Sequence, residues 1–438
     1  MRLIFLVFFL LLGLTNYGQV GFQWESDKDK IEIPFTFVDN LIIIPVEINN
    51  TKLNMLLDSG SEPSLIFSFP ENDTIQLYNT KKIKISGLGN EEMAEGIYSD
   101  KNTANVSGFI NRGFDLLVIL DENLNFSSRI GIPVNGILGY SFFKNNIVQI
   151  DYQKKKITVY KDRKILEKRK IKSFTPLPIS VVNDRAYLNV RAKLDEKEHN
   201  LKLLVDTGLG DGLWLFENEE IKSNANYFED VLGEGIGGTV FGKKSRLDEL
   251  QFSKFSFKSP LVCYPDTASY KQLRLIKNRN GSLGGAMLKR FSMIMDYKGE
   301  QLYLKKSVFY DDPFNYNMSG IEVQHGGIEW VKDELVRDSK PSNSLNANDL
   351  VFENSNLKYK FTLKPVYVIA SIRKNSPAET AGLLIGDKIL RIDRKSVGNL
   401  TKQIIDELLQ SEDGKTIEVE IERKGIKKKV EFKLKKLL

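Results

Sequence analysis

Two stretches decide the fold of this chain: Leu56-Leu57-Asp58-Ser59-Gly60-Ser61, and its near repeat Leu204-Val205-Asp206-Thr207-Gly208-Leu209. They are separated by 206 − 58 = 148 positions. In each stretch an Asp follows apolar residues that indicate the end of a buried strand. A small hydroxyl residue and a glycine come next, and glycine permits a tight turn. The chain is therefore expected to hold two carboxylates, each at the end of a rigid strand.

Two further marks repeat in register with the aspartates. An apolar-apolar-Gly element ends at Gly139 and, with Ser282 in place of the first apolar residue, again at Gly284, and an Asp-Tyr pair follows each element. The motif Asp lies 139 − 58 = 81 positions before this glycine in the first half and 284 − 206 = 78 positions before it in the second. The Asp of the Asp-Tyr pair lies the same distance after the glycine in both halves, at 151 − 139 = 12 and 296 − 284 = 12 positions. Chance alone would place an Asp-[Ser/Thr]-Gly tripeptide in such a chain about 0.2 times. Two copies in register predict an internal duplication.

Short apolar segments with strand patterning fill both halves. In the first half they run from Ile31 to about Tyr160, and the second half repeats their order. Glycine-bearing segments lie at matching places, Gly87 to Asn90 and Gly233 to Gly238. The last part of the chain differs and contains one clear helix, Thr401 to Gln410. The fold class is therefore expected to be mainly β, with a small α+β unit at the end.

The composition excludes several kinds of site. The chain has 438 residues, of which 41% are hydrophobic, and this is enough to build packed cores. With two histidines and one cysteine it has no His-Glu-x-x-His zinc helix, no Cys-rich metal knuckle and no intramolecular disulfide. A Ser-His-Asp triad would have only His325 as a plausible base, without a Gly-x-Ser-x-Gly elbow. Neither a metal nor a cofactor is expected.

The two ends of the chain carry different signals. The net charge of +6 comes largely from lysines near the C-terminus that alternate with apolar residues, as on the solvated face of a strand, so no nucleic acid partner is expected. At the other end, Met1-Arg2 and the apolar run Leu3 to Leu14 have the layout of a secretory signal peptide. A spanning helix needs about 20 apolar residues. We expect cleavage of residues 1–19 and a periplasmic or extracellular protein without a membrane span; an uncleaved anchor is the alternative.

Over roughly residues 31–305 the chain resembles the pepsin/retropepsin superfamily of aspartic proteases, because both Asp motifs and both apolar-apolar-Gly elements look like those of that family. The resemblance implies a bilobed acid-protease-like β-barrel body with lobes at 20–160 and 161–310, and a substrate cleft under β-hairpin flaps. The catalytic pair would be Asp58 and Asp206. The supporting residues would be Ser59, Gly60, Thr207, Gly208, Leu138, Gly139, Leu283 and Gly284, and the flap candidates are Gly87, Leu88, Gly89, Gly235, Ile236 and Gly237.

Two such aspartates would share one proton, since like charges about 3 Å apart cannot both ionise. One would then activate a water as base while the other protonates the substrate carbonyl. The hydroxyls of Ser59 and Thr207 are expected to hydrogen-bond and fix the carboxylates. Leu209 stands where the family has a small residue and is expected to narrow the site. The flap glycines could equally be ordinary hairpin turns.

The last unit resembles a bacterial-type PDZ domain, through Asn375-Ser376-Pro377-Ala378-Glu379-Thr380-Ala381-Gly382-Leu383 and the following Ile385 to Ile392. The resemblance implies a domain at 318–438, with a polar insertion around 335–355, that binds extended peptides beside the helix Thr401 to Gln410. The tentative peptide-binding residues are Gly320, Ile321, Glu322 and Val323.

These features lead to one hypothesis and two alternatives. The hypothesis is an exported, monomeric aspartic endopeptidase that hydrolyses peptide bonds with Asp58, Asp206 and an activated water, while its PDZ domain binds peptide segments of substrates or partners. The first alternative is a catalytically inactive, protease-like peptide-binding or scaffold protein that acts through the PDZ domain. The second, two single-lobed units that each dimerise, is disfavoured because the covalent repeat already supplies both halves.

Overall fold

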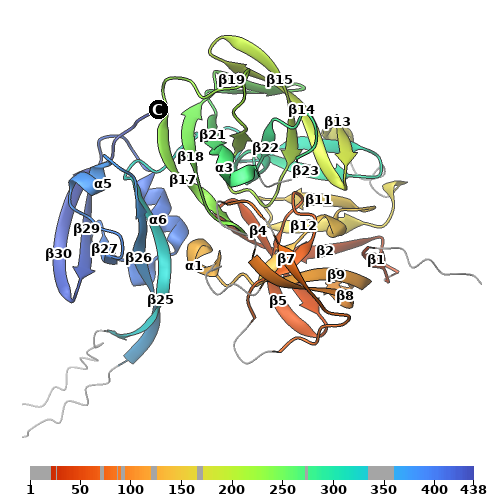
Figure 1. Cartoon of the computed structure of the whole chain (residues 1–438), viewed down its shortest axis with the longest axis horizontal. Helices are drawn as coiled ribbons and strands as arrows, with labels where there is room; N and C mark the ends of the chain where they lie inside the picture. Colours follow the sequence, from red (N-terminus) through yellow and green to blue (C-terminus); the bar gives the residue numbers. More distant parts are fainter. Residues whose placement is uncertain are drawn as a thin grey trace, which may run out of the picture.

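The computed structural model describes residues 21–25, 27–69, 74–85, 87–89, 94–119, 126–164, 171–271, 275–333 and 360–438. The expected signal peptide at 1–19, the polar insertion around 335–355 and Asn90 lie outside these residues. The described residues form three β-sheets with short helices, and the C-terminal unit lies to one side of the rest (Figure 1). The predicted fold class, a mainly β body followed by a C-terminal α+β unit, is confirmed.

The first sheet has nine strands and is built from the first half of the chain. Its strand order is β1-β9-β6-β10-β5-β4-β8-β7, with β3 beside β4. Helix α1 (Phe126–Ile130) precedes β10 and the 3-10 helix η1 (Tyr140–Phe142) follows it. The strands are β1 (Gln23–Trp24), β3 (Thr36–Val38), β4 (Leu41–Ile48), β5 (Thr51–Leu57), β6 (Ser64–Ile66), β7 (Lys81–Ile85), β8 (Ala94–Val106), β9 (Phe109–Ile119) and β10 (Gly136–Leu138).

The second sheet has fifteen strands and joins the two halves, because β11 of the first half pairs antiparallel with β23 of the second. Its order is β17-β18-β21-β16-β22-β15-β14-β13-β24-β23-β11-β12-β2, with β19 paired to β14 and β20 paired to β19. The first half supplies β2 (Lys30–Pro34), β11 (Ile147–Asp151) and β12 (Lys156–Tyr160). The second half supplies β13 (Thr175–Val182), β14 (Arg185–Leu194), β15 (Lys197–Val205), β16 (Leu213–Leu215), β17 (Phe228–Gly235), β18 (Gly238–Arg246), β19 (Glu249–Phe252), β20 (Phe255–Lys258), β21 (Leu261–Pro265), β22 (Gly281–Leu283), β23 (Phe291–Asp296) and β24 (Gln301–Lys306), and the helices η2 (Ile171–Ser173), α3 (Thr267–Tyr270) and α4 (Gly285–Leu288).

The strands that lead into the two Asp motifs are buried at their ends. In β5 buried and exposed residues alternate as far as Asn54, and then Met55, Leu56 and Leu57 are all buried. The reason is that β10 pairs with this end of β5 in parallel, and parallel strands inside a sheet are covered on both faces. Strand β15 ends in the same way beside β22. The repeat of sequence marks therefore corresponds to a repeat of strand pairing.

The C-terminal unit is a six-stranded sheet with its own apolar core. The predicted helix at Thr401 to Gln410 is α6, in which Ile405 and Leu409 are buried and Thr401 caps the N-terminus by accepting from the amide of Ile404. The elements of the unit are β25 (Ile321–Asp333), β26 (Lys360–Ile372), α5 (Pro377–Thr380), β27 (Lys388–Ile392), β28 (Lys395–Ser396), η3 (Val397–Asn399), α6 (Lys402–Leu409), β29 (Thr416–Arg423) and β30 (Ile426–Lys433).

One large hydrophobic cluster runs through both halves of the body, whereas the core of the C-terminal unit is a separate cluster. Phe228 of β17 belongs to that second cluster, where its ring packs on the ring of Tyr316. The unit is therefore packed against the second half of the body. Among the described residues, no helix has the length and apolar character that crossing a bilayer would require.

Candidate active site

Each motif aspartate sits directly after a buried strand, and the neighbouring apolar-apolar-Gly element holds its backbone. The amide of Asp58 donates to the carbonyl of Leu138 at 2.9 Å, and the amide of Asp206 donates to the carbonyl of Leu283 at 3.0 Å. Both leucines are buried. The two aspartates are thus positioned by the same pairing in the two halves.

The hydroxyl residues after the aspartates tie the two halves together. The Ser59 hydroxyl donates to the Val205 carbonyl at 2.7 Å, and the Thr207 hydroxyl donates to the Leu57 carbonyl at 2.7 Å. Each hydroxyl also accepts from the opposite backbone amide, at 3.1 Å for Ser59 and 3.0 Å for Thr207. The sequence predicted that these hydroxyls would bond to the carboxylates; they bond instead to the opposite strand end, and so fix the carboxylates through the backbone.

Glycine is required after each hydroxyl residue because the opposite carboxylate occupies the space that a side chain would need. A Cβ on Gly60 would lie 2.8 Å from the carboxyl carbon of Asp206, and a Cβ on Gly208 would lie 2.2 Å from that of Asp58. The corresponding glycines behind the loops are also enclosed, since a Cβ on Gly139 or Gly284 would lie within 3 Å of a loop carbonyl oxygen. The motif glycines therefore allow the two carboxylates to meet.

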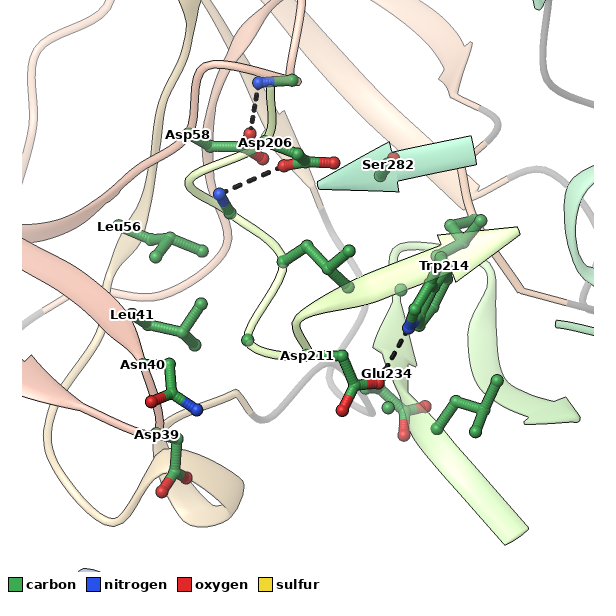
Figure 2. Close-up of a pocket in the computed structure, with 18 of the residues that line it drawn as sticks. Asp39, Asn40, Leu41, Leu56, Asp58, Asp206, Asp211, Trp214, Glu234 and Ser282 are labelled. Carbon is green, nitrogen blue, oxygen red and sulfur yellow. Dashed lines mark hydrogen bonds between the residues drawn. The ribbon is translucent and has the colours of Figure 1, made fainter. Parts of the chain in front are cut away.

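The two carboxylates lie side by side at the floor of the site (Figure 2). One oxygen of Asp58 accepts from the amides of Gly60 at 2.7 Å and Ser61 at 3.0 Å. One oxygen of Asp206 accepts from the amide of Gly208 at 3.2 Å. The two carboxyl groups are close enough for each to shift the pKa of the other. The pair therefore has the contacts of two acids that hold a proton between them.

Burial and mutual repulsion keep one of the two carboxyl groups protonated. Burial, followed by the nearby Asp206 charge, raises the pKa of Asp58 to about 7. Burial also raises the pKa of Asp206, although the Arg279 charge and hydrogen bonds from Gly208 and Ser282 oppose the increase. Below about pH 7 the pair therefore holds at least one proton.

A cavity of about 1600 Å³ opens above the two aspartates. Apolar side chains line it near the carboxylates, including Leu41, Leu56 and Trp214 (Figure 2). Leu209, which the sequence predicts to narrow the active site, also lines the cavity and packs against the cluster that contains Trp214.

The two glycine-bearing segments meet over this cavity. Gly87 and Leu88, which follow β7, line it together with Gly235 and Ile236 at the tip of the β17–β18 hairpin. The amide of Gly237 donates to the carbonyl of Leu88 at 2.8 Å, and the amide of Gly89 donates to the carbonyl of Ser269 at 2.9 Å. The segments therefore touch each other through backbone atoms and cover the carboxylates.

Gly235→Ala should separate the two covering segments, because the new Cβ would lie 1.9 Å from the carbonyl oxygen of Leu88. We expect faster hydrogen exchange at the amide of Gly237, which donates to that carbonyl, by about tenfold or more. The matched control is Gly233→Ala in the same strand, where an added Cβ meets nothing within 4 Å. Equal exchange rates in the two variants would show that the contact does not hold the segments together.

Arg129 of α1 connects three parts of the molecule. Its guanidinium pairs with Glu234 at the tip of the β17–β18 hairpin at 2.6 Å, and with Glu322 of β25 at 3.2 Å. Helix α1 lies against β25, and Lys402 of α6 pairs with Asp39 of the first half at 3.2 Å. The covering hairpin and the C-terminal unit are thus both tied to the first half of the body.

Arg129→Ala should loosen both attachments while leaving the fold intact. Each of its ion pairs is partly exposed, so each contributes only about 0.2–1 kcal/mol. We expect faster hydrogen exchange in the β17–β18 hairpin and at the start of β25. Arg112→Ala serves as the control, since the side chain of Arg112 is exposed and forms an ion pair with Glu25 on the surface. Unchanged exchange in both segments would contradict a linking role for Arg129.

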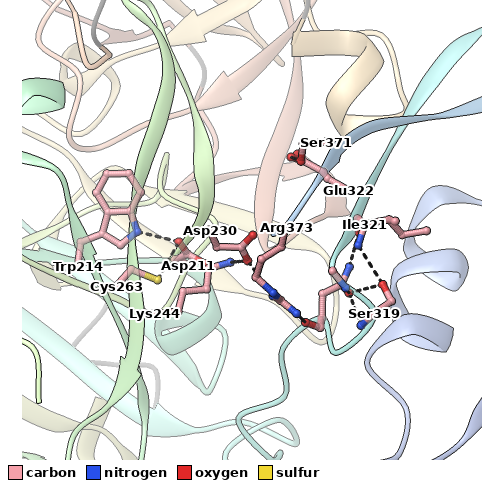
Figure 3. Close-up of polar contacts among 12 residues, drawn as sticks. Asp211, Trp214, Asp230, Lys244, Cys263, Ser319, Ile321, Glu322, Ser371 and Arg373 are labelled. Atoms are coloured by element: carbon pink, nitrogen blue, oxygen red, sulfur yellow. Dashed lines mark hydrogen bonds and ion pairs between the residues drawn. The ribbon is translucent and has the colours of Figure 1, made fainter. Parts of the chain in front are cut away.

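A second set of polar contacts joins the C-terminal unit to the second half (Figure 3). Arg373, which follows β26, pairs with Asp230 of β17 at 3.5 Å and lies over the ring of Phe228. Asp230 also pairs with Lys244 of β18 at 3.4 Å. The hairpin that covers the carboxylates therefore contacts the C-terminal unit through Phe228 and Asp230.

The structure places the tentative peptide-binding residues of the C-terminal unit in two environments. Gly320, Ile321 and Glu322 line the same cavity as the aspartates, together with polar residues of α6 such as Gln403. Val323 is buried in the core of the unit. The start of β25 and one face of α6 therefore open toward the carboxylates.

Sequence reasoning missed Arg279, Ser282 and Arg129. A signal for Ser282 was present, since it is a polar residue in the apolar-apolar-Gly element, at the place where the first half has Ile137. Arg129 gave no local signal, because its partners lie more than a hundred residues away in the sequence.

Among the described residues, no group of three or more His, Cys, Asp or Glu side chains could hold a metal ion.

Comparison with known proteins identifies one part of the chain. Residues 327–434 match the family model of the PDZ domain, so the C-terminal unit contains a PDZ domain. Among solved structures, the chain is similar to an aspartic proteinase from Irpex lacteus, with a TM-score of 0.42 and 11% identity, over 65% of this chain and 100% of that one. The search of curated proteins found no match.

Proposed function

We propose that this protein is an aspartic endopeptidase that hydrolyses peptide bonds with Asp58, Asp206 and one water molecule. The observation that carries the proposal is the meeting of two strand-end carboxyl groups, both with raised pKa values, in one cavity that the two glycine-bearing segments also line. Such a pair supplies a base and an acid at the same place. Export to the periplasm or beyond, which we expect from the signal-peptide layout of residues 1–19, is likewise part of the proposal.

The two carboxyl groups have different roles in this reaction. The ionised Asp206 accepts a proton from the water as it attacks the peptide carbonyl carbon, and Asp58 donates its proton to the carbonyl oxygen. The resulting tetrahedral species has a neutral hydroxyl, so no oxyanion has to be stabilised. Its collapse breaks the C–N bond: Asp206 passes its proton to the leaving nitrogen, and Asp58 takes a proton back from one hydroxyl as the carbonyl forms. The covering segments would exclude bulk water and hold the extended chain.

The PDZ domain is proposed to deliver peptide segments to this site. PDZ domains bind extended peptides by adding them as a strand to a sheet edge beside a helix. Here the edge strand β25 and helix α6 both contribute residues to the cavity that holds the aspartates. If a polypeptide were bound there, the next residues of that polypeptide would lie close to the reacting carboxylates. This supports a PDZ domain that delivers substrate to the site.

The proposal is tested by incubating the purified chain from residue 20 with an unfolded protein between pH 4 and pH 8 and identifying new termini by mass spectrometry. We expect cleavage between apolar side chains, with a rate that falls as the pH rises through about 7, where Asp58 loses its proton. A chain that binds such peptides and leaves them intact at every pH would instead be the inactive peptide-binding protein.

A further inference from the structure

The surroundings of the two aspartates are unequal, although the strands that carry them repeat. Counting back five positions from the element glycine reaches Arg279 in the second half and Val134 in the first. Counting back two positions reaches Ser282 and Ile137. Val134 and Ile137 are buried apolar residues. The second half thus has a cationic side chain and a hydroxyl, Arg279 and Ser282, at the positions where the first half has two apolar side chains.

Arg279 and Ser282 form a connected pair next to Asp206. The Arg279 Nη2 group donates to the Ser282 hydroxyl oxygen at 2.8 Å, and its Nε group donates to the Gly281 carbonyl at 3.2 Å. The guanidinium also lies over the ring of Phe216, with 5.3 Å to the ring centroid. Its position is therefore fixed by three contacts. Ser282 is buried and, with Arg279 as its donor, can give its own proton to Asp206.

The backbone alone would favour the opposite choice of anion. Asp58 accepts from two loop amides, whereas Asp206 accepts from one, and that contact is longer at 3.2 Å. Hydrogen bonds to a carboxylate stabilise its charged form. Without further groups, Asp58 would be the better anion. Arg279 and Ser282 are the features that reverse this preference.

We propose that Arg279, acting through Ser282, is a positioning residue that makes Asp206 the ionised member of the pair and leaves the shared proton on Asp58. The second half of the body thereby supplies the base that activates water, and the first half supplies the acid. This inference deepens the proposed function and rests on it for its catalytic meaning. The assignment of charge itself is a property of the folded protein and can be measured without substrate.

Few other charged or titratable groups face these residues. Asp206 is faced by Asp58, Arg279 and, more remotely, the buried Tyr297. Arg279 is faced by Asp206, Tyr187 and Arg185. Burial keeps the pKa of Tyr297 above its usual range, so this phenol stays neutral in the pH range considered. The charge of Arg279 is the strongest influence that favours an anionic Asp206.

The test is a titration of the two carboxyl groups by NMR in protein with ¹³C-labelled Asp side chains. The two signals are assigned by their disappearance in Asp58→Asn and Asp206→Asn. In the wild type we expect Asp206 to remain ionised to lower pH than Asp58. In Arg279→Gln the Asp206 transition should move to higher pH by about one to three pH units, the usual effect of a neighbouring guanidinium. Arg279→Lys, which keeps the charge, should restore most of the difference.

Two further variants keep the result interpretable. Ser282→Ala removes only the connecting hydroxyl and should move the Asp206 transition in the same direction by a smaller amount; it carries the test if Arg279→Gln does not fold. Arg112→Gln removes an arginine that lies far from the site in sequence and pairs with Glu25, and it should leave both transitions unchanged. An Asp206 transition that is the same in wild type, Arg279→Gln and Ser282→Ala would overturn the inference.

The titration separates this inference from the proposed function. If the wild type hydrolyses peptides but Arg279→Gln leaves the carboxyl transitions unmoved, the inference is wrong and the activity stands. If the transitions move as expected but no peptide is hydrolysed, the charge assignment stands and the proposed activity is wrong. When both hold, the acid limb of the rate profile should move to higher pH in Arg279→Gln together with the Asp206 transition.

Discussion

Replacement of Asp206 by Asn should lower the rate of peptide hydrolysis by about 10²- to 10⁴-fold or more, the usual contribution of a positioned acid or base. The amide cannot accept the proton of the attacking water, and Asp58 loses the partner that shares its proton. Asn has nearly the shape of Asp, so the Gly60 backbone that packs on this side chain keeps its place. The measurement is kcat/KM on a defined peptide at pH 5–6.

A matched control distinguishes chemistry from folding in this experiment. Asp211 lies five residues further along the same loop, and its carboxylate accepts a hydrogen bond from the indole nitrogen of Trp214 at 2.7 Å. Asp211→Asn should therefore reduce the rate far less than Asp206→Asn. If both variants of the loop retain full activity, hydrolysis does not depend on the pair of aspartates.

Replacement of Asp58 by Asn should abolish hydrolysis and yet stabilise the folded protein at alkaline pH. The pKa of Asp58 is raised to about 7 in the folded state, against 3.8 for an unperturbed Asp side chain. The folded state therefore binds more protons than the unfolded state between these values, and stability falls as the pH rises from about 4 to 7. Asn has no proton to lose. At pH 8 the variant should be more stable by up to about 4 kcal/mol.

The measurement is the free energy of unfolding by urea at pH 4.5 and at pH 8, for wild type and Asp58→Asn. The stability difference should be small at pH 4.5, where the wild-type carboxyl is protonated, and large at pH 8. A difference that does not change with pH would mean that Asp58 has an ordinary pKa. A variant less stable than wild type at pH 8 would contradict the account of repulsion between the two carboxylates.

The core of the candidate site could be predicted from the sequence because it depends on local pattern and on repetition. The apolar run before each Asp predicts a buried strand end, and the repeat of three marks in register predicts two such ends related by a duplication. In the structure the strands that end at Asp58 and Asp206 have the same parallel pairing, β5 with β10 and β15 with β22, as the repeat implies. Each glycine after the hydroxyl residue could be assigned to a tight turn, but its contact with the opposite carboxylate could not.

Other features could not be predicted because they arise from contacts between distant segments. Nothing near Gly87 indicates that its segment meets Ile236 of the opposite hairpin. The roles of the hydroxyls on Ser59 and Thr207 were predicted wrongly in detail, since their preference for the opposite backbone depends on how the two halves approach. Arg279 lies outside every motif, and only the comparison with Val134 at the matching position of the first half draws attention to it.

The central claim is that Asp58 and Asp206 act as one acid–base pair on a peptide carbonyl. The most direct test measures the binding of a peptide in which a tetrahedral carbon with a hydroxyl group replaces the scissile carbonyl. Such a group imitates the species formed by water attack, and analogues of this kind bind at least about 10²-fold tighter than substrates. By calorimetry at pH 5.5, the wild type should bind this peptide at least about 10²-fold more tightly than Asp58→Asn and Asp206→Asn do. Equal affinity in the three proteins would contradict the claim.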